Sequence, residues 1–428
     1  LEDVFVGGSK KRRGRIFFQK TDGTFENKYI PVVENDSTFE DVDAVLEDID
    51  NDGDLDLAVA SGGNEFCGES EFLGQRIYIN DGHGNFVNKI ALPKAYLTAS
   101  CIVPNDYNQD GLIDFFIGGR SVPKNYGMVP ESYLFKNLGN HKFENVTNTI
   151  SSKLSKVGLV RDGQWADIDG DGDKDLILAT EWDAIKIALN DNQNFNIFDI
   201  TEDKGWWSFI LPYDFDHDGD IDILAGNAGE NTRFQPTSKQ PLRLYVEDFD
   251  NDGQLDQILT YFVAGREMPF ANYKELSNKF PFIKAKYSSS KEFARATLND
   301  IFGKRNLAKA VTYEVTLLSS VLFENAGGNL RFVSHRLPPE IQFSSLMAGT
   351  IIKQEKDVYV DLIVGGNFYG YNIEMGRSDA SYGNIIRVNN NMVMQAFPLG
   401  DLIIKDQVRE ILPILNQGKE IFLVGRNN

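Results

Sequence analysis

One nine-residue pattern constrains the fold of this chain more than any other feature. The pattern is D-x-[DN]-x-D-G-x-x-D, and it occurs five times. A short apolar run follows each copy, as in "DIDNDGDLDLAVASGG" from Asp48. A fixed loop followed by a fixed strand is typical of repeat architectures, in which each unit buries its apolar faces against its neighbours. The length of 428 residues, too great for one ordinary core, also favours such an architecture.

Each repeat contains more than one strand. A second signature, "RIYINDGHGNF" from Arg76, is a strand, an Asn/Asp/Gly turn and a second strand, and similar segments begin at Ile16, Tyr133 and Leu322. Such turn residues tolerate positive φ and favour hairpins. A unit of about four short antiparallel strands is the content of a propeller blade. We therefore predict an all-β fold: a single β-propeller over residues 1–428, with seven blades, or eight as the alternative.

The spacing of the loops affects the blade count. The first three loops begin 58 and 61 residues apart, whereas those at Asp214 and Asp248 begin only 34 residues apart. Because 34 residues are too few for a full blade and its connections, we place both of these loops in one blade. The apolar strand also recurs without the loop in "EDVFVGG" and "EIFLVGRNN", near the two ends of the chain. We expect these ends to meet and close the ring.

The segment 266–318 does not follow the repeat. Its apolar residues have helical spacing, with Lys and Glu between them and Gly303 as a stop signal. We predict a small helical insertion within the propeller, because about 50 residues bury too little to fold as a separate domain. We also predict an exposed surface of aromatic and basic residues for a protein partner, the alternative being that the aromatics seal the insertion onto the blades. The aromatics are Phe270, Tyr273, Phe280, Phe282 and Tyr287, and the basic residues are Lys274, Lys279, Lys284, Lys286 and Lys291.

The repeated loops carry the chemistry of calcium binding. Positions 1, 3, 5 and 9 supply side-chain oxygens, glycine at position 6 permits a sharp turn, and position 7 offers a backbone carbonyl; calcium prefers six to eight such oxygens. An EF-hand is excluded, because its position 12 needs Glu and here holds Val59 in the first loop. We predict about five Ca²⁺ ions. Their ligands are Asp48, Asp50, Asp52, Asp54 and Asp56; Asp106, Asn108, Asp110, Leu112 and Asp114; Asp167, Asp169, Asp171, Asp173 and Asp175; Asp214, Asp216, Asp218, Asp220 and Asp222; and Asp248, Asp250, Asp252, Gln254 and Asp256.

The charge balance agrees with bound cations. The chain has 63 acidic and 43 basic residues and a formal net charge of −20. Such a surface repels the phosphate backbone, so we predict no nucleic-acid partner. No run of 18 apolar residues exists, and we predict no transmembrane segment in the chain. Without metal the clustered carboxylates repel one another, so we expect calcium to be structural.

Other residue types give weaker signals. Cys67 and Cys101 are either two lone thiols or one disulfide bridge. The four histidines are scattered without the spacing of a zinc site. The tryptophans form either a sugar-stacking platform or packing between blades, and they are Trp165, Trp182, Trp206 and Trp207. We predict no catalytic residues and no organic cofactor.

Several segments resemble a known family. They include "GQWADIDGDGDKDLILATEW", "AGNAGENTRF" and "LIVGGNFYGYNIEMGRSDASYGN". The units are similar to the FG-GAP/VCBS repeats of integrin α-subunit propellers, and more closely to those of bacterial VCBS proteins associated with ASPIC/UnbV domains. The resemblance implies calcium-binding loops, an exported or surface-attached protein and no established catalysis. The chain departs from that group in lacking an ASPIC/UnbV-like C-terminal domain and in having incomplete loops in some repeats.

The expected function is that of a non-catalytic interaction module, extracytoplasmic, either secreted or at a bacterial cell surface in association with the outer membrane. It would bind a partner protein or a glycan, as part of a larger envelope assembly. Because "LEDVFVGG" is the tail of a repeat, we expect residues before Leu1, where an anchor would attach the protein to a membrane. One alternative is a polysaccharide lyase or hydrolase with its site in the propeller channel. Another is a purely architectural subunit.

Overall fold

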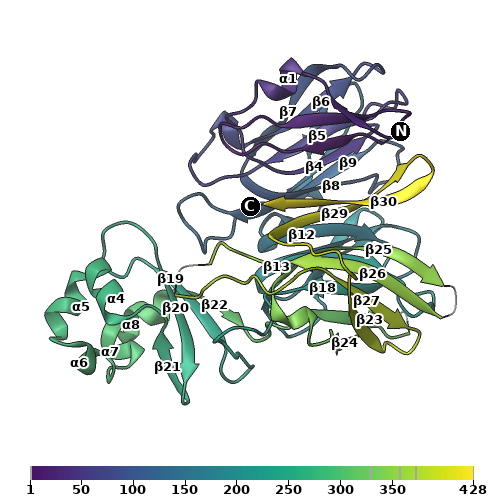
Figure 1. Ribbon diagram of the computed structural model, residues 1–428. Coiled ribbons are helices and arrows are strands. Elements are labelled where there is room, and N and C mark those ends of the chain that lie inside the picture. Colours follow the sequence, from purple (N-terminus) through teal and green to yellow (C-terminus); the bar gives the residue numbers. More distant parts are fainter. Residues whose placement is uncertain (1, 328–329, 356–357, 372–373, 428) are drawn as a thin grey trace.

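The protein has an all-β propeller fold. The structure, a computed structural model, describes residues 2–327, 330–355, 358–371 and 374–427 (Figure 1). Within these residues the strands form eight antiparallel sheets, most of them with four strands. The described part of the chain contains no helix that is long and apolar enough to cross a membrane.

Consecutive strands make up most of the sheets. From the N-terminus, the first four sheets contain β1 (Val4–Val6), β2 (Arg15–Gln19) and β3 (Phe25–Asn27); β4 (Asp41–Glu47), β5 (Asp56–Ser61), β6 (Gly74–Asn80) and β7 (Phe86–Tyr96); β8 (Thr98–Asn105), β9 (Asp114–Ser121), β10 (Tyr133–Asn137) and β11 (Phe143–Asn145); and β12 (Leu159–Ala166), β13 (Asp175–Asp183), β14 (Lys186–Asp191), β15 (Asn194–Asp199) and the short β16 (Gly205–Trp206).

The other four sheets follow the same scheme with one interruption. They contain β17 (Phe209–Tyr213), β18 (Asp222–Gly226), β23 (Val321–Asn325) and β24 (Phe332–Arg336); β19 (Leu242–Glu247), β20 (Asp256–Val263), β21 (Arg266–Pro269) and β22 (Val311–Val315); β25 (Leu346–Glu355), β26 (Tyr359–Gly366), β27 (Asn384–Asn389) and β28 (Met394–Pro398); and β29 (Gln407–Asn416) and β30 (Lys419–Asn427). Short helical turns are α1 (Pro31–Glu34), η1 (Glu71–Leu73), α2 (Thr147–Ile150), α3 (Ser152–Ser155) and η2 (Ile341–Phe343).

The first strands of successive sheets lie side by side and surround the channel. Strand β4 contacts β8, β8 contacts β12, β12 contacts β17, β17 contacts β25, and β25 contacts β29. The second strand of a sheet has both faces covered by neighbouring sheets. Its sequence is therefore largely apolar and does not alternate between apolar and polar residues. All six residues of β5, "DLAVAS", are buried for this reason.

The two ends of the chain meet. The side chain of Gln19 in β2 donates to the carbonyl of Leu415 in β29 (2.8 Å), and the Leu415 amide donates to the carboxylate of Glu2 (2.6 Å). Around the adjacent turn, Asn416 donates to the carbonyl of Gly23. The first and last sheets are therefore neighbours, as the strand echoes predict. The seven-blade count itself stays a prediction.

The sheet β19–β22 corrects the placement of the last two aspartate loops. The loop at Asp214 joins β17 to β18, whereas the loop at Asp248 joins β19 to β20 in a different sheet, so our assignment of both to one blade is wrong. The short interval arises because sheet β19–β22 is inserted whole between β18 and β23. Figure 1 shows this sheet and its helices projecting from the side of the body.

Five short helices lie within the predicted insertion, between β21 and β22. They are α4 (Tyr273–Lys279), α5 (Pro281–Lys286), α6 (Ser290–Phe293), α7 (Leu298–Phe302) and α8 (Lys304–Lys309). Their apolar faces pack into a separate core with Ile258 of β20 and with Phe249 of the loop between β19 and β20. The prediction of exposed aromatics is therefore wrong: Phe280 and Tyr287 are buried, and Phe270, Tyr273 and Phe282 are half-buried. Lysines remain on the outside.

Candidate metal centres

The backbone of the aspartate loops contains two left-handed positions. In the first loop Asn51 at position 4 has φ of 61° and Gly53 at position 6 has φ of 93°. Positions 4 and 6 of the other four loops also have positive φ. A β-carbon at Gly53 would meet no atom, so glycine is required there by its backbone conformation rather than by space. These two reversals bend the chain around the carboxylates.

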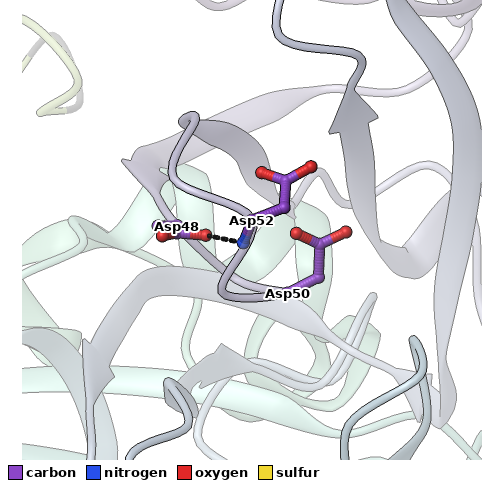
Figure 2. A group of neighbouring side chains, drawn as sticks. All are labelled: Asp48, Asp50 and Asp52. Carbon is purple, nitrogen blue, oxygen red and sulfur yellow. Dashed lines mark hydrogen bonds between the residues drawn. The ribbon is translucent and has the colours of Figure 1, made fainter.

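Four of the five loops bring three carboxylates together. Figure 2 shows Asp48, Asp50 and Asp52 on one turn, with the backbone amide of Asp52 bonded to Asp48 at 3.1 Å. In each group one oxygen from every residue lies within 4.8 Å of the others. The groups are Asp48, Asp50 and Asp52; Asp167, Asp169 and Asp175; Asp214, Asp216 and Asp218; and Asp248, Asp250 and Asp252.

Three of these groups contain an unpartnered oxygen that fits a cation. The Oδ1 atoms of Asp50, Asp167 and Asp214 are shielded from solvent, and each lacks a hydrogen-bond partner among the described residues. A buried carboxylate oxygen without a donor is costly unless a cation coordinates it. Hard oxygen donors at this density suit calcium. These residues would hold the ion, and the positive charge of the ion would offset the repulsion between their carboxylates.

The aspartate at position 9 also holds the backbone. The two oxygens of Asp56 accept hydrogen bonds from the amides of Ile49 (3.2 Å) and Asn80 (2.8 Å). The corresponding aspartates of the third and fourth loops make the same pair of bonds, and burial raises the pKa of Asp222 to about 7, with added repulsion from Asp216. The position-9 carboxylate therefore ties the loop to the third strand of its sheet, and in the third loop Asp175 also belongs to the carboxylate group.

Basic side chains occupy some loops and leave others free for metal. The second loop is not among the carboxylate groups: Asn108 donates to Asp114 (2.9 Å), and Lys136 pairs with Asp110 (3.0 Å). In the fifth loop, Lys279 from α4 pairs with Asp256 (2.9 Å). The third and fourth loops have no ion pair with a basic residue in the described part of the chain. In the first loop His141 lies 2.9 Å from Asp50, so the third and fourth loops are the two whose carboxylates pair with no basic side chain among the described residues.

Buried asparagines connect neighbouring sheets, and our reading of the sequence missed them. Asn137 at the end of β10 donates to the carbonyls of Ile49 (2.9 Å) and Ile113 (3.1 Å), and thus links its own loop to the loop of the preceding sheet. Asn190 and Asn325 bind the preceding loop in the same way. The signal was present as the Asn that ends "RIYIN", "YLFKN", "IALN" and "LFEN". By its sequence context alone this Asn is assigned to the turn that follows the strand.

The remaining candidates separate into packing and cavity-lining residues. Trp207 is fully buried against Phe323, and Trp165 packs against Phe195, so these two serve as packing residues. Trp182 and Trp206 line a cavity. Both cysteines are free, Cys67 exposed and Cys101 buried, so the disulfide alternative does not hold.

Comparisons with known proteins identify the repeats. A model described as an FG-GAP-like repeat matches three overlapping segments, residues 48–117, 106–178 and 167–225. Each segment starts at the first aspartate of one loop and ends in the strand after the next loop. The chain therefore carries three FG-GAP-like repeats over its first four loops. The closer likeness to VCBS proteins with ASPIC/UnbV domains stays a prediction.

The other comparisons are distant. No curated protein matches the chain. Two similar solved structures are a lectin of Agrocybe aegerita, described as recognising non-reducing terminal N-acetylglucosamine, and BBS1N in complex with ARL6DN. The lectin is 11% identical, with 92% of this chain and 89% of the lectin covered and a TM-score of 0.35. The second is 10% identical, with 89% and 87% covered and a TM-score of 0.33. At these TM-scores neither protein informs the function of this chain.

Proposed function

We propose that the chain is a calcium-stabilised, non-catalytic binding module that acts outside the cytoplasm, where it holds a partner protein or a glycan. The observation that carries this proposal is the repeated loop with three gathered carboxylates and a shielded, unpartnered oxygen. Extracellular modules bind calcium at about 10⁻⁴ to 10⁻³ M, so such loops are filled where calcium is abundant. A propeller held in this way offers a rigid platform, and the chain's acidic net charge disfavours nucleic acid.

The insertion supports a role in binding. Its helices α4–α6 expose Lys274, Lys284, Lys286 and Lys291 on an otherwise acidic molecule. The part of a repeat protein that does not repeat is the part most able to serve one particular partner. A face of this kind suits an acidic partner surface.

The test has a metal arm and a binding arm. Calorimetric titration of the chelated protein should show calcium uptake at several sites, and calcium should raise the melting temperature. The calcium-loaded protein should then bind a defined set on a glycan array or at the surface of its source cells. A double substitution Lys284→Glu and Lys291→Glu should weaken cell-surface binding without changing the melting temperature. No calcium uptake would overturn the metal part, and no binding by fully loaded protein would overturn the binding part.

A further inference from the structure

A cavity of about 300 Å³ lies between strands β9, β12, β13 and β25 and the inserted sheet. Arg161 and Met347 line it, and both are the extra residues of bulges in the channel-side strands β12 and β25. Bulges turn a side chain away from the regular pleat and are common beside binding sites. Leu244 and Leu259 of the inserted sheet line the cavity too, so the insertion completes a wall that the repeats alone do not provide.

Two arginines in this cavity have unused hydrogen-bonding capacity. Arg161 is half-buried, and its side chain makes no hydrogen bond or ion pair with any described residue. Arg120 has one long ion pair, 3.9 Å from Glu181. The carboxylate of Asp162 does not serve Arg161, since it accepts from the amides of Gly163 and Ile210. An arginine held in a cavity with free donors is suited to bind a carboxylate through two parallel hydrogen bonds.

Aromatic rings form the other walls, and a hydrogen-bonded chain fixes them. The indole of Trp182 donates to the hydroxyl of Tyr126 (2.7 Å), which donates to Glu181 (2.9 Å). Trp206 packs edge-on against Trp182, with ring centroids 5.2 Å apart and planes at 78°, and also contacts Tyr371. These rings therefore present an apolar surface that is already ordered before a ligand arrives.

We propose that this cavity binds an acidic sugar unit, a hexuronate, with its carboxylate on Arg161 and Arg120 and its ring against the aromatic wall. The proposal rests on the proposed binding function and names its ligand class. A carboxylate alone, as on a peptide side chain, would use the arginines but would leave most of the aromatic wall uncovered. A hexuronate has both parts within one small molecule: an apolar C–H face on its ring and a carboxylate. The cavity volume is at the lower end of the range for small-ligand sites.

The experiment uses the calcium-loaded full chain and a carboxylated disaccharide, digalacturonate, in calorimetry and in tryptophan fluorescence. Digalacturonate should bind and should change the fluorescence, because Trp182 and Trp206 line the cavity. Its methyl ester, of similar size but without charge, should bind at least tenfold more weakly. Arg161→Ala should cost about tenfold or more in affinity, and Arg161→Lys should cost less. The matched control Arg12→Ala, an exposed arginine in the loop between β1 and β2, should change nothing.

Three outcomes overturn the proposal. The first is equal binding of digalacturonate and its ester, and the second is unchanged affinity in Arg161→Ala with a normal calcium-dependent melting temperature. The third is tighter binding of a blocked Gly-Asp-Gly peptide than of digalacturonate, which would make the site a peptide site. A protein that fails to bind calcium at all would instead refute the proposed function, so the two failures are distinguishable.

Discussion

The side-chain amide of Asn137 donates a hydrogen bond of 2.9 Å to the backbone carbonyl of Ile49 in the aspartate loop of the preceding sheet. Asn137 is 1% exposed, and its backbone amide also donates to Asp114, the position-9 aspartate of its own loop. One residue therefore joins two successive loops and the strand between them. Because Asn190 and Asn325 repeat the arrangement, the first four aspartate loops form a connected series rather than independent turns.

Replacing Asn137 with alanine should therefore destabilise the protein strongly. The change removes the donor that serves the carbonyls of Ile49 and Ile113. Each carbonyl left without a donor costs about 1 to 3 kcal/mol. We expect a loss of about 2 kcal/mol or more in the free energy of unfolding, measured by denaturant titration in calcium. The exposed Asn88→Ala serves as the control and should lie within about 0.5 kcal/mol of the parent. A parent-like stability for Asn137→Ala would contradict the linking role.

Substitution of one calcium ligand should separate metal binding from loop repulsion. Asp169→Asn removes a charge from the third loop, where no lysine competes for the carboxylates. In chelator we expect the variant to melt at or above the parent temperature, because repulsion with Asp167 and Asp175 falls. Calcium should raise the free energy of unfolding of the variant by about 2 to 3 kcal/mol less than that of the parent, if the calcium concentration is about a hundred times the Kd of the parent site. Differential scanning fluorimetry in both buffers checks this, with Asp401→Asn, an exposed aspartate outside the loops, as control.

Lys279 gives a prediction about competition between an internal cation and calcium. Its ammonium group pairs with Asp256 at 2.9 Å in the fifth loop. Lys279→Met should destabilise the chelated protein, since Asp256 loses its counter-charge, and should tighten calcium binding at that loop because the competing charge is gone. Calorimetric titration should show one class of sites with higher affinity than in the parent. An unchanged titration would show that Lys279 and calcium use different oxygens.

The parts of the structure that followed from sequence are those with a local cause. The loop pattern fixes oxygen donors and a left-handed glycine at set positions, and the apolar run after it must be buried on both faces, so loops and second strands were found correctly. The place of the Asp248 loop was not found, because a whole inserted sheet between β18 and β23 leaves no local mark. The aromatics of the insertion were misjudged for the same reason. Phe280 is buried because it packs against Phe302 of α7, in a core that also contains Phe249 and Ile258, and this packing exists in three dimensions alone.

The cavity lined by Arg161 and Trp206 could not be predicted from local sequence patterns either. Arg161 and Arg120 belong to different sheets, and Trp206 and Tyr371 are separated by 165 positions in the chain. Only the closed ring and the inserted sheet bring such residues together. The tryptophans could be recognised as candidates from their residue type, but which of the four face a cavity depends on the packing of β13 and β16.

The half-buried carboxylate of Asp162 leads us to expect that the stability of the protein falls as the pH rises toward neutrality. Asp162 on β12 has its pKa raised to about 7 by burial, with repulsion from Asp43 and Glu410 across the channel adding to the effect, although two backbone amides donate to it. In the unfolded chain the pKa is near 4. Below about pH 4 the group is protonated in both states and its contribution to stability is fully present. As the pH rises to about 7 only the unfolded state ionises, so the contribution is lost.

Asp162→Asn should remove that dependence. Asparagine keeps an oxygen for the Ile210 amide, which donates at 3.0 Å, and carries no charge at any pH. We expect the free energy of unfolding of the variant to equal that of the parent, or to lie slightly below it, at pH 4.5. Above pH 7 the variant should be more stable by on the order of 1 to 2 kcal/mol. This is less than the full 1.36 kcal/mol per pKa unit, because the half-buried carboxylate keeps part of its hydration. The measurement is the difference in unfolding free energy between variant and parent from pH 4.5 to 8 in saturating calcium, since the loop aspartates titrate alike in both and cancel. A difference that is flat across this range would mean that Asp162 is ionised in the folded protein throughout, and that the buried amides of Gly163 and Ile210 outweigh its burial.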